Sequence, residues 1–231
     1  MNGTNGAVAR QQRLGGWAAL YLALALIAAM PYFLLVVDYQ GATTAADKVA
    51  LIVSNYSSMY AMYFVTYIFF GFALGVLALG LYDRLRAEAP FAARLAASAG
   101  ALWAFALVAC GMVYTYGMTT IVKLAETDSA VAATVWQGIE PVALGLGGAG
   151  GEVLGGLWVL LVSVIALRTR ALPRALGWLG AVVGAAGLVS AVPALNDAVM
   201  AFGVLQIVWL VWLSVALLKT KVPAVAGGVS L

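Results

Sequence analysis

Apolar and polar residues are arranged along this chain in long blocks. Six blocks are apolar over about 20 residues, the length that a helix needs to cross the hydrocarbon core of a bilayer. These blocks cover roughly residues 16–37, 59–82, 92–118, 142–167, 174–193 and 199–218. The pattern therefore predicts an all-α polytopic membrane protein, built as a bundle of six transmembrane helices.

The two longest connections between these blocks also have helical features. In residues 39–58, apolar side chains recur at the spacing of one helical face, at Val49, Ile52, Val53 and Tyr56. In residues 119–140, Asp128 and Ser129 are typical helix-capping residues. We expect a short helix in each connection, lying at the membrane surface on the external side.

Basic residues gather on one side of the predicted bundle. Ten of the 12 Lys and Arg residues flank the six blocks on the side of both termini, and only Lys48 and Lys123 lie on the other side. Cytoplasmic loops of membrane proteins carry an excess of Lys and Arg. We therefore expect residues 1–15 and 219–231 to be cytoplasmic segments on either side of a transmembrane domain, residues 16–218.

The composition narrows the classes of function. Hydrophobic residues make up 65% of the chain and charged residues 9%, against about 25% charged residues in soluble proteins. The chain has no His, which removes His-based catalysis and His-ligated metals, and its single Cys110 cannot close an intramolecular disulfide. It has no phosphate-binding or nucleophile motif. We expect no catalytic residue, cofactor, metal or nucleic-acid partner.

A glycine-rich run interrupts the fourth apolar block. Seven glycines lie between residues 145 and 156, and three of them are four residues apart: Gly147, Gly151 and Gly155. Such spacing allows close helix packing, with Gly180 and Gly184 of the fifth block or Gly71 and Gly75 of the second as partners. Because glycine is a poor helix former, the run could instead bend or break the helix. Close packing is the simpler of the two interpretations.

Glu152 is the one acidic residue within an apolar block. It follows Pro141 by eleven residues, or about 16 Å along a helix, near the middle of the bilayer. No Lys or Arg lies at a comparable depth, so we expect the carboxyl group to be neutral much of the time. Three roles are open for it: a proton or cation site, a counter-charge for a cationic substrate, or a hydrogen bond to a neighbouring helix.

Tyrosines follow one helical face near the start of the second block. They lie at Tyr56, Tyr60, Tyr63 and Tyr67, and the third block adds Tyr114. Tyr60, Tyr63, Tyr67 and Tyr114 could line an external opening above Glu152 that suits a small organic cation. The alternative is an aromatic belt at the membrane interface.

Two segments carry a resemblance to a known family. In Leu160–Leu188, an apolar helix ends at Arg168-Thr169-Arg170, and Leu172-Pro173-Arg174 opens the next helix. In Tyr63–Arg86, an apolar helix ends at Leu81-Tyr82-Asp83-Arg84. Both resemble bacterial membrane proteins of the domain of unknown function 4386 family. The resemblance implies a six-helix, multi-pass protein of the bacterial cytoplasmic (inner) membrane, with no site residues that can be carried over.

Two functional hypotheses follow. The first is proton-linked or small-solute transport, or binding of a small ligand, through Glu152. The second is a non-catalytic scaffold or accessory subunit, in which the glycine faces dock a second copy or another membrane protein. An enzyme that acts on lipids is a weaker third possibility because no nucleophile is evident. In every case the lipid bilayer is a partner.

Overall fold

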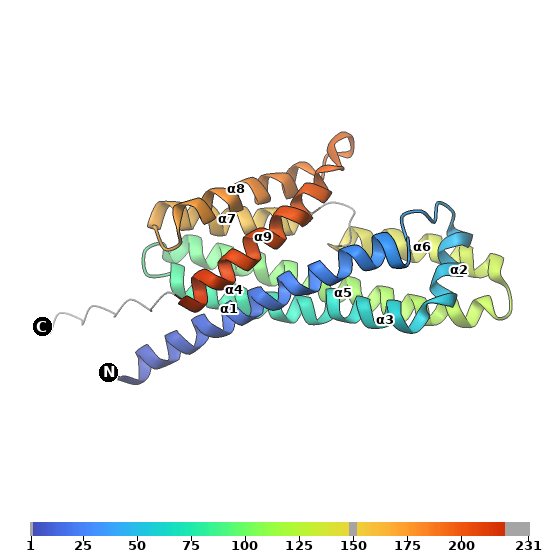
Figure 1. Cartoon of the computed structure of the whole chain (residues 1–231), viewed down its shortest axis with the longest axis horizontal. Coiled ribbons are helices and arrows are strands. Elements are labelled where there is room, and N and C mark those ends of the chain that lie inside the picture. Colours follow the sequence, from blue (N-terminus) through green and yellow to red (C-terminus); the bar gives the residue numbers. More distant parts are fainter. Residues whose placement is uncertain (1, 148–151, 220–231) are drawn as a thin grey trace, which may run out of the picture.

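The computed structural model of the chain is an elongated bundle of helices. It describes residues 2–147 and 152–219, and these contain no β-strand. Figure 1 shows the helices running along the long axis of the molecule. In chain order they are α1 (Asn2–Pro31), η1 (Tyr32–Val36), α2 (Ala45–Ser54), α3 (Tyr56–Tyr63), η2 (Phe64–Phe69), α4 (Phe70–Leu85), α5 (Pro90–Ala125), α6 (Ser129–Gly147), α7 (Val153–Thr169), α8 (Arg174–Val189), η3 (Pro193–Leu195) and α9 (Ala198–Lys219).

Four helical segments of the described chain are long and apolar enough to cross a membrane. They are Ala9–Val36, Tyr56–Leu85, Pro90–Ala125 and Ala198–Lys219. The helices α7 and α8 are also apolar but shorter, at 17 and 16 residues. The fold is thus that of a membrane-embedded helical protein, with four candidate spans in place of the six expected.

The expected fourth span, residues 142–167, is not one helix. The helix α6 ends at Gly147, whose φ of +147° lies outside the helical region, and α7 begins only at Val153. Glu152 precedes α7 in a non-helical conformation. Glycine adopts a positive φ without steric cost. The glycine-rich run was expected either to pack closely or to break the helix, and at Gly147 it ends a helix.

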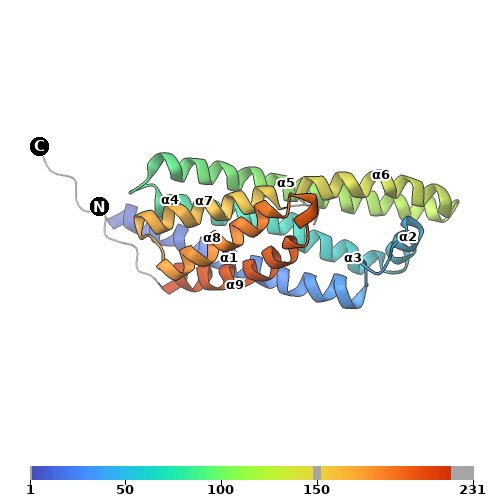
Figure 2. The same cartoon turned by 90° about the horizontal axis from the view of Figure 1, so that it is seen from above.

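The two halves of the bundle contain different helices. Figures 1 and 2 show α7, α8 and α9 alongside one half of α5, and α2, α3 and α6 around the other half. The 36 residues of α5 extend about 54 Å, well beyond the ~30 Å hydrocarbon core of a bilayer. We call the half with α7, α8 and α9 the glycine half, and the half with α2, α3, η2 and α6 the aromatic half.

The glycine half ends where the arginine-rich turns meet. Arg84 of α4 donates from Nε to the carbonyl oxygen of Ala171 in the α7–α8 turn (2.8 Å) and from a guanidinium nitrogen to Gln12 Oε1 of α1 (2.9 Å). Gln12 donates in turn to the Leu217 carbonyl near the end of α9 (2.7 Å). Four parts of the chain that the charge pattern predicts on one side of the membrane therefore meet at one end of the bundle.

In the glycine half, α7 and α8 pack backbone against backbone. A Cβ on Gly156 would lie 2.6 Å from the backbone nitrogen of Leu188, and one on Gly184 would lie 2.6 Å from that of Leu160. Real Cβ atoms do not approach other atoms so closely, so both positions require glycine. This close approach fixes the position of the chain just before α7, where Glu152 lies.

The aromatic half is held by large side chains. Its core contains Met59, Tyr63, Tyr114 and Trp136, all buried, and α2 covers it with Val49 and Ile52. The helix α2 begins at a capping box, in which the Thr44 hydroxyl accepts from the Asp47 backbone N–H (3.1 Å) and the Asp47 carboxylate accepts from the Thr44 N–H (3.2 Å). The helix expected in residues 39–58 is therefore present.

Candidate functional site

The interruption between α6 and α7 positions Glu152. Its backbone N–H donates to Ser190 Oγ at the end of α8 (3.2 Å), and that fully buried hydroxyl donates to the Gly187 carbonyl (2.7 Å). Its carbonyl accepts the first helical hydrogen bond of α7, from Gly156 (2.8 Å). The close-packed α7–α8 pair thus holds the backbone of Glu152, and leaves its side chain at the junction of the two halves.

The Glu152 carboxyl group belongs to a half-buried residue between α6 of the aromatic half and α7 of the glycine half. It lies within electrostatic range of Tyr67 in η2 and Cys110 in α5. The Cys110 thiol donates to the Ala143 carbonyl of α6 (3.2 Å). Within residues 2–147 and 152–219, the Glu152 carboxyl makes no hydrogen bond or ion pair. A half-buried carboxyl group without a partner is costly and needs a reason.

Three of the tyrosines singled out from the sequence lie together, and one of them, Tyr67, is within electrostatic range of Glu152. The rings of Tyr63 and Tyr114 stack with centroids 4.4 Å apart and planes 22° apart, and Tyr67 is 5.7 Å from each of them. Tyr63 is 4% exposed and Tyr114 is 3% exposed. The hydroxyls of all three make no hydrogen bond in the described parts of the chain. Among the described residues, the buried side-chain polar atoms without a hydrogen-bond partner are Trp103 Nε1 and Ser163 Oγ, so the three tyrosine hydroxyls retain some accessible surface, at which water can bind.

Tyr60 lies apart from this cluster. Its ring stacks on Phe64 (6.0 Å) and tilts against Tyr56 (5.8 Å), and the Tyr56 hydroxyl is hydrogen-bonded to Thr119 (2.8 Å). Tyr60 and Tyr63 both belong to the α-helix α3, and the π-helical turn η2, with its i→i+5 hydrogen bonds, begins only at Phe64. The structure thus gathers Tyr63, Tyr67 and Tyr114, and leaves Tyr60 outside.

The glycines expected to pack helices have separate environments. Gly147 lies against Leu107 of α5, and Gly155 lies against Trp103 of α5 and Phe202 of α9. Gly184 meets α7, and Gly180 lies against Ser163 and Trp209. Gly151 is outside the described residues. Because α6 ends at Gly147, these positions do not form one continuous groove.

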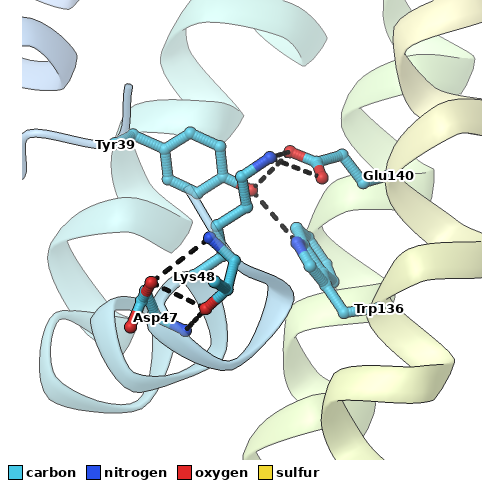
Figure 3. A network of polar contacts seen from close by, with 6 residues as sticks. Tyr39, Asp47, Lys48, Trp136 and Glu140 are labelled. Atoms are coloured by element: carbon cyan, nitrogen blue, oxygen red, sulfur yellow. Dashed lines mark hydrogen bonds and ion pairs between the residues drawn. The ribbon is translucent and has the colours of Figure 1, made fainter. Parts of the chain in front are cut away.

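A second polar cluster lies at the far end of the aromatic half (Figure 3). Lys48 of α2 pairs with both carboxylate oxygens of Glu140 in α6, at 2.7 and 2.8 Å. The Tyr39 hydroxyl donates to Glu140 Oε1 (2.9 Å) and accepts from Trp136 Nε1 (3.1 Å). We call these four residues the outer cluster. The sequence pattern does not reveal this cluster, because Tyr39 and Lys48 are 88 or more residues away from Trp136 and Glu140.

The outer cluster is electrostatically coupled. Burial, and then the neighbouring Glu140 carboxylate, raise the pKa of Tyr39 well above its ordinary value. The Lys48 ammonium lies 5.3 Å from the centroid of the Tyr39 ring. The side chains of Lys48 and Glu140 are only 23% and 14% exposed, so solvent screens the pair less than a surface salt bridge.

Aromatic contacts connect the outer cluster to the three tyrosines. The Trp136 ring is 6.2 Å from Tyr114, and Phe33 of η1 is 5.0 Å from Tyr63. Ring contacts therefore continue from Trp136 of the outer cluster to the three tyrosines. Among the described residues, no group of three or more His, Cys, Asp and Glu side chains could hold a metal ion.

Comparison with known proteins gives one match. A family model described as "Domain of unknown function (DUF4386)" matches residues 17–216. This range runs from the middle of α1 to the last turn of α9. No curated protein and no solved structure matches the chain. The match covers most of the chain, and the chain therefore belongs to the DUF4386 family.

Proposed function

We propose that this chain is a proton-linked membrane transporter in which Glu152 binds and releases the proton. The proposal includes a bilayer orientation with the arginine-rich turns in the cytoplasm, as the excess of basic residues predicts, and α7 and α8 as two further, shorter spans. It also includes the cytoplasmic membrane of a bacterium as the location. One observation carries it: a half-buried carboxyl group at a helix interruption, with no hydrogen bond and no basic partner among the described residues.

The surroundings of Glu152 distinguish between its three candidate roles. A structural role requires a hydrogen bond from the carboxyl group to a neighbouring helix, and the described residues provide none. A binding site for an organic cation requires free aromatic ring faces. The faces of Tyr63 and Tyr114 are stacked on each other. What remains are hydroxyl and carboxyl oxygens, which suit water and a proton.

The helix interruption also supports transport. Secondary transporters commonly place their coupling-ion sites at interrupted helices near the bilayer midplane. Irregular backbone at membrane depth is tolerated where it is buried in protein or lines a water-filled cavity. The ends of α6 and α7 meet this condition because α5 and α8 flank them. Glu152 at such a position can exchange a proton without the cost of a fully buried charge.

The scaffold hypothesis depends on glycine faces that are free to dock a partner. In this structure Gly155, Gly156, Gly180, Gly184 and Gly187 all lie against other helices of the same chain. The close helix contacts that these glycines allow are therefore already made within the bundle. This favours transport over docking through these faces.

The experiment is an infrared titration of the full chain in lipid vesicles. Between about pH 9 and about pH 5, a range that includes the values known for buried carboxyl groups, we expect a protonated-carboxyl band that Glu152→Gln abolishes. The matched control is Glu126→Gln, at an exposed acid next to the end of α5. A band that persists in Glu152→Gln and disappears in the control would refute the proposal.

A further inference from the structure

A hollow of about 360 Å³ lies on the surface of the first turns of α1. It is lined by Gly6, Ala9, Arg10, Arg13, Leu14 and Trp17. These positions recur every three or four residues, so they share one face of the helix. A Cβ on Gly6 would meet no atom within 4 Å. The hollow therefore has two guanidinium side chains on one side and, further along the helix, two large apolar side chains on the other.

The two arginines of this hollow are unpaired positive charges. Arg10 and Arg13 are exposed, and within residues 2–147 and 152–219 neither side chain makes a hydrogen bond or an ion pair. By contrast, Arg84 and Arg86 of the neighbouring turn are bonded to protein groups. The chain has no acidic residue before Asp38, so α1 has no negative charge of its own to neutralise its arginines. The hollow therefore favours an anion from outside the protein.

The apolar side of the hollow continues along the helix. Leu14 and Trp17 are exposed, and so is Leu24, which lies seven residues beyond Trp17 on the same face of the candidate span Ala9–Val36. Trp17 lies about 10 Å from Arg10 along the helix axis. Because exposed tryptophan favours the headgroup level of a bilayer, the arginines lie towards the phosphates and water, and Leu24 lies towards the acyl chains.

We propose that this hollow binds one anionic phospholipid, with its phosphate between Arg10 and Arg13 and an acyl chain along the apolar side. Guanidinium groups donate several hydrogen bonds to phosphate oxygens. A free phosphate would contact only the arginines and would leave the apolar side in water. A phosphatidylcholine would bring its own cation to the arginines, so a headgroup with a net negative charge fits better. This inference does not depend on the role of Glu152.

The test measures how readily lipids of each headgroup class contact Trp17. The full chain is reconstituted in phosphatidylcholine vesicles that contain increasing fractions of phosphatidylglycerol with brominated acyl chains, which quench tryptophan fluorescence on contact. The Trp17 signal is the difference in fluorescence between the wild type and Trp17→Phe. We expect half of this signal to be quenched at an at least fivefold lower fraction of brominated phosphatidylglycerol than of brominated phosphatidylcholine. Equal fractions for the two lipids would overturn the proposal.

Matched variants separate the hollow from the general attraction of a basic surface. Arg10→Gln and Arg13→Gln should each raise the fraction of phosphatidylglycerol needed for half-quenching by about fivefold, the contribution of one basic residue near an anionic surface. The controls are Arg168→Gln and Arg174→Gln, which remove the same charge from exposed positions beside the α7–α8 turn. They should leave the fraction unchanged, and an equal rise in the controls would refute a specific site.

A competition experiment distinguishes the two sources of a phosphate group. Millimolar inorganic phosphate should not restore the Trp17 fluorescence quenched by brominated phosphatidylglycerol, because it makes no contact with the apolar side of the hollow. Full recovery of the fluorescence would show that the hollow binds a soluble anion, and would overturn the assignment to a lipid. The comparison of the two brominated lipids with the Arg10 and Arg13 side chains intact also tests the proposal if an arginine variant fails to fold.

Discussion

The two halves of this bundle are stabilised by different kinds of contact. In the glycine half, α7 and α8 approach so closely that Gly156 and Gly184 each face the backbone of the other helix. In the aromatic half, large rings fill the space between α5, α6 and η2, and polar groups lie among them. Close backbone packing leaves no room for water, whereas hydroxyl groups at the edges of stacked rings can bind it. The two halves therefore differ in how they are packed: the first by contact between backbones, the second by stacked rings with polar groups among them.

The largest effect is expected in the glycine half. Gly156→Leu would force α7 and α8 apart, because even a Cβ there would lie 2.6 to 2.8 Å from backbone atoms of α8. We expect a loss of about 3 kcal/mol in the free energy of unfolding, the upper end for overpacking. Reversible unfolding in detergent micelles measures it. The control is Gly75→Leu, where a Cβ would have no neighbour within 4 Å. Similar losses in both variants would show that the α7–α8 contact is not special.

The next effect concerns the outer cluster of the aromatic half. Lys48→Met leaves the Glu140 carboxylate, which is 14% exposed, without its cation. Removing one partner of a buried pair costs about 3–5 kcal/mol, and the remaining exposure reduces our expectation to about 2 kcal/mol. Thermal unfolding of Lys48→Met measures this loss, with the exposed Lys123→Met as control. If both variants unfold at the wild-type temperature, the outer cluster does not hold α2 to α6.

The third effect is a dependence of the free energy of unfolding on pH, which arises from Tyr39. Its pKa is raised in the folded protein by burial and by Glu140, whereas in the unfolded chain it is near 10. As the pH rises, the unfolded chain therefore loses this proton first. The contribution of Tyr39 to the free energy of unfolding is complete below about pH 10, and above it declines by at most about 1.4 kcal/mol per pH unit. The free energy of unfolding measured through this range should fall less steeply in Tyr39→Phe. An unchanged slope would mean that Tyr39 is not held as a neutral phenol.

The smallest effect is the difference in stability between variants of two buried serines in the glycine half. Ser190 bonds the Glu152 N–H and the Gly187 carbonyl, so Ser190→Ala should cost about 1 kcal/mol. The Ser163 hydroxyl is buried on α7 without a hydrogen-bond partner in the described chain, so Ser163→Ala should be neutral or slightly stabilising. Chemical denaturation of both variants would test this difference. A larger loss at Ser163 would show that its hydroxyl binds water, and would weaken the contrast between the halves.

Much of the candidate site could be anticipated from the sequence, but its geometry could not. Glu152 stands out as the one acid in an apolar block, and the tyrosine spacing indicates that Tyr63 and Tyr67 share a face. Tyr60 lies on the same α-helix as Tyr63 but packs against Tyr56 and Phe64, outside the cluster. The glycine run predicts either close packing or a break. The structure contains both, because Gly147 ends α6 while Gly155 and Gly156 pack within α7.

The sequence by itself determined the membrane-embedded helical class, the family, and the presence of a carboxyl group deep in an apolar segment. These properties depend on composition and on local blocks of residues, which can be read without knowing what lies nearby in space. Only the tertiary structure decided that Lys48 pairs with Glu140, 92 residues away, and that Tyr114 stacks on Tyr63. Such pairs form because helix packing brings distant segments into register, and the energy of one contact depends on the whole bundle around it.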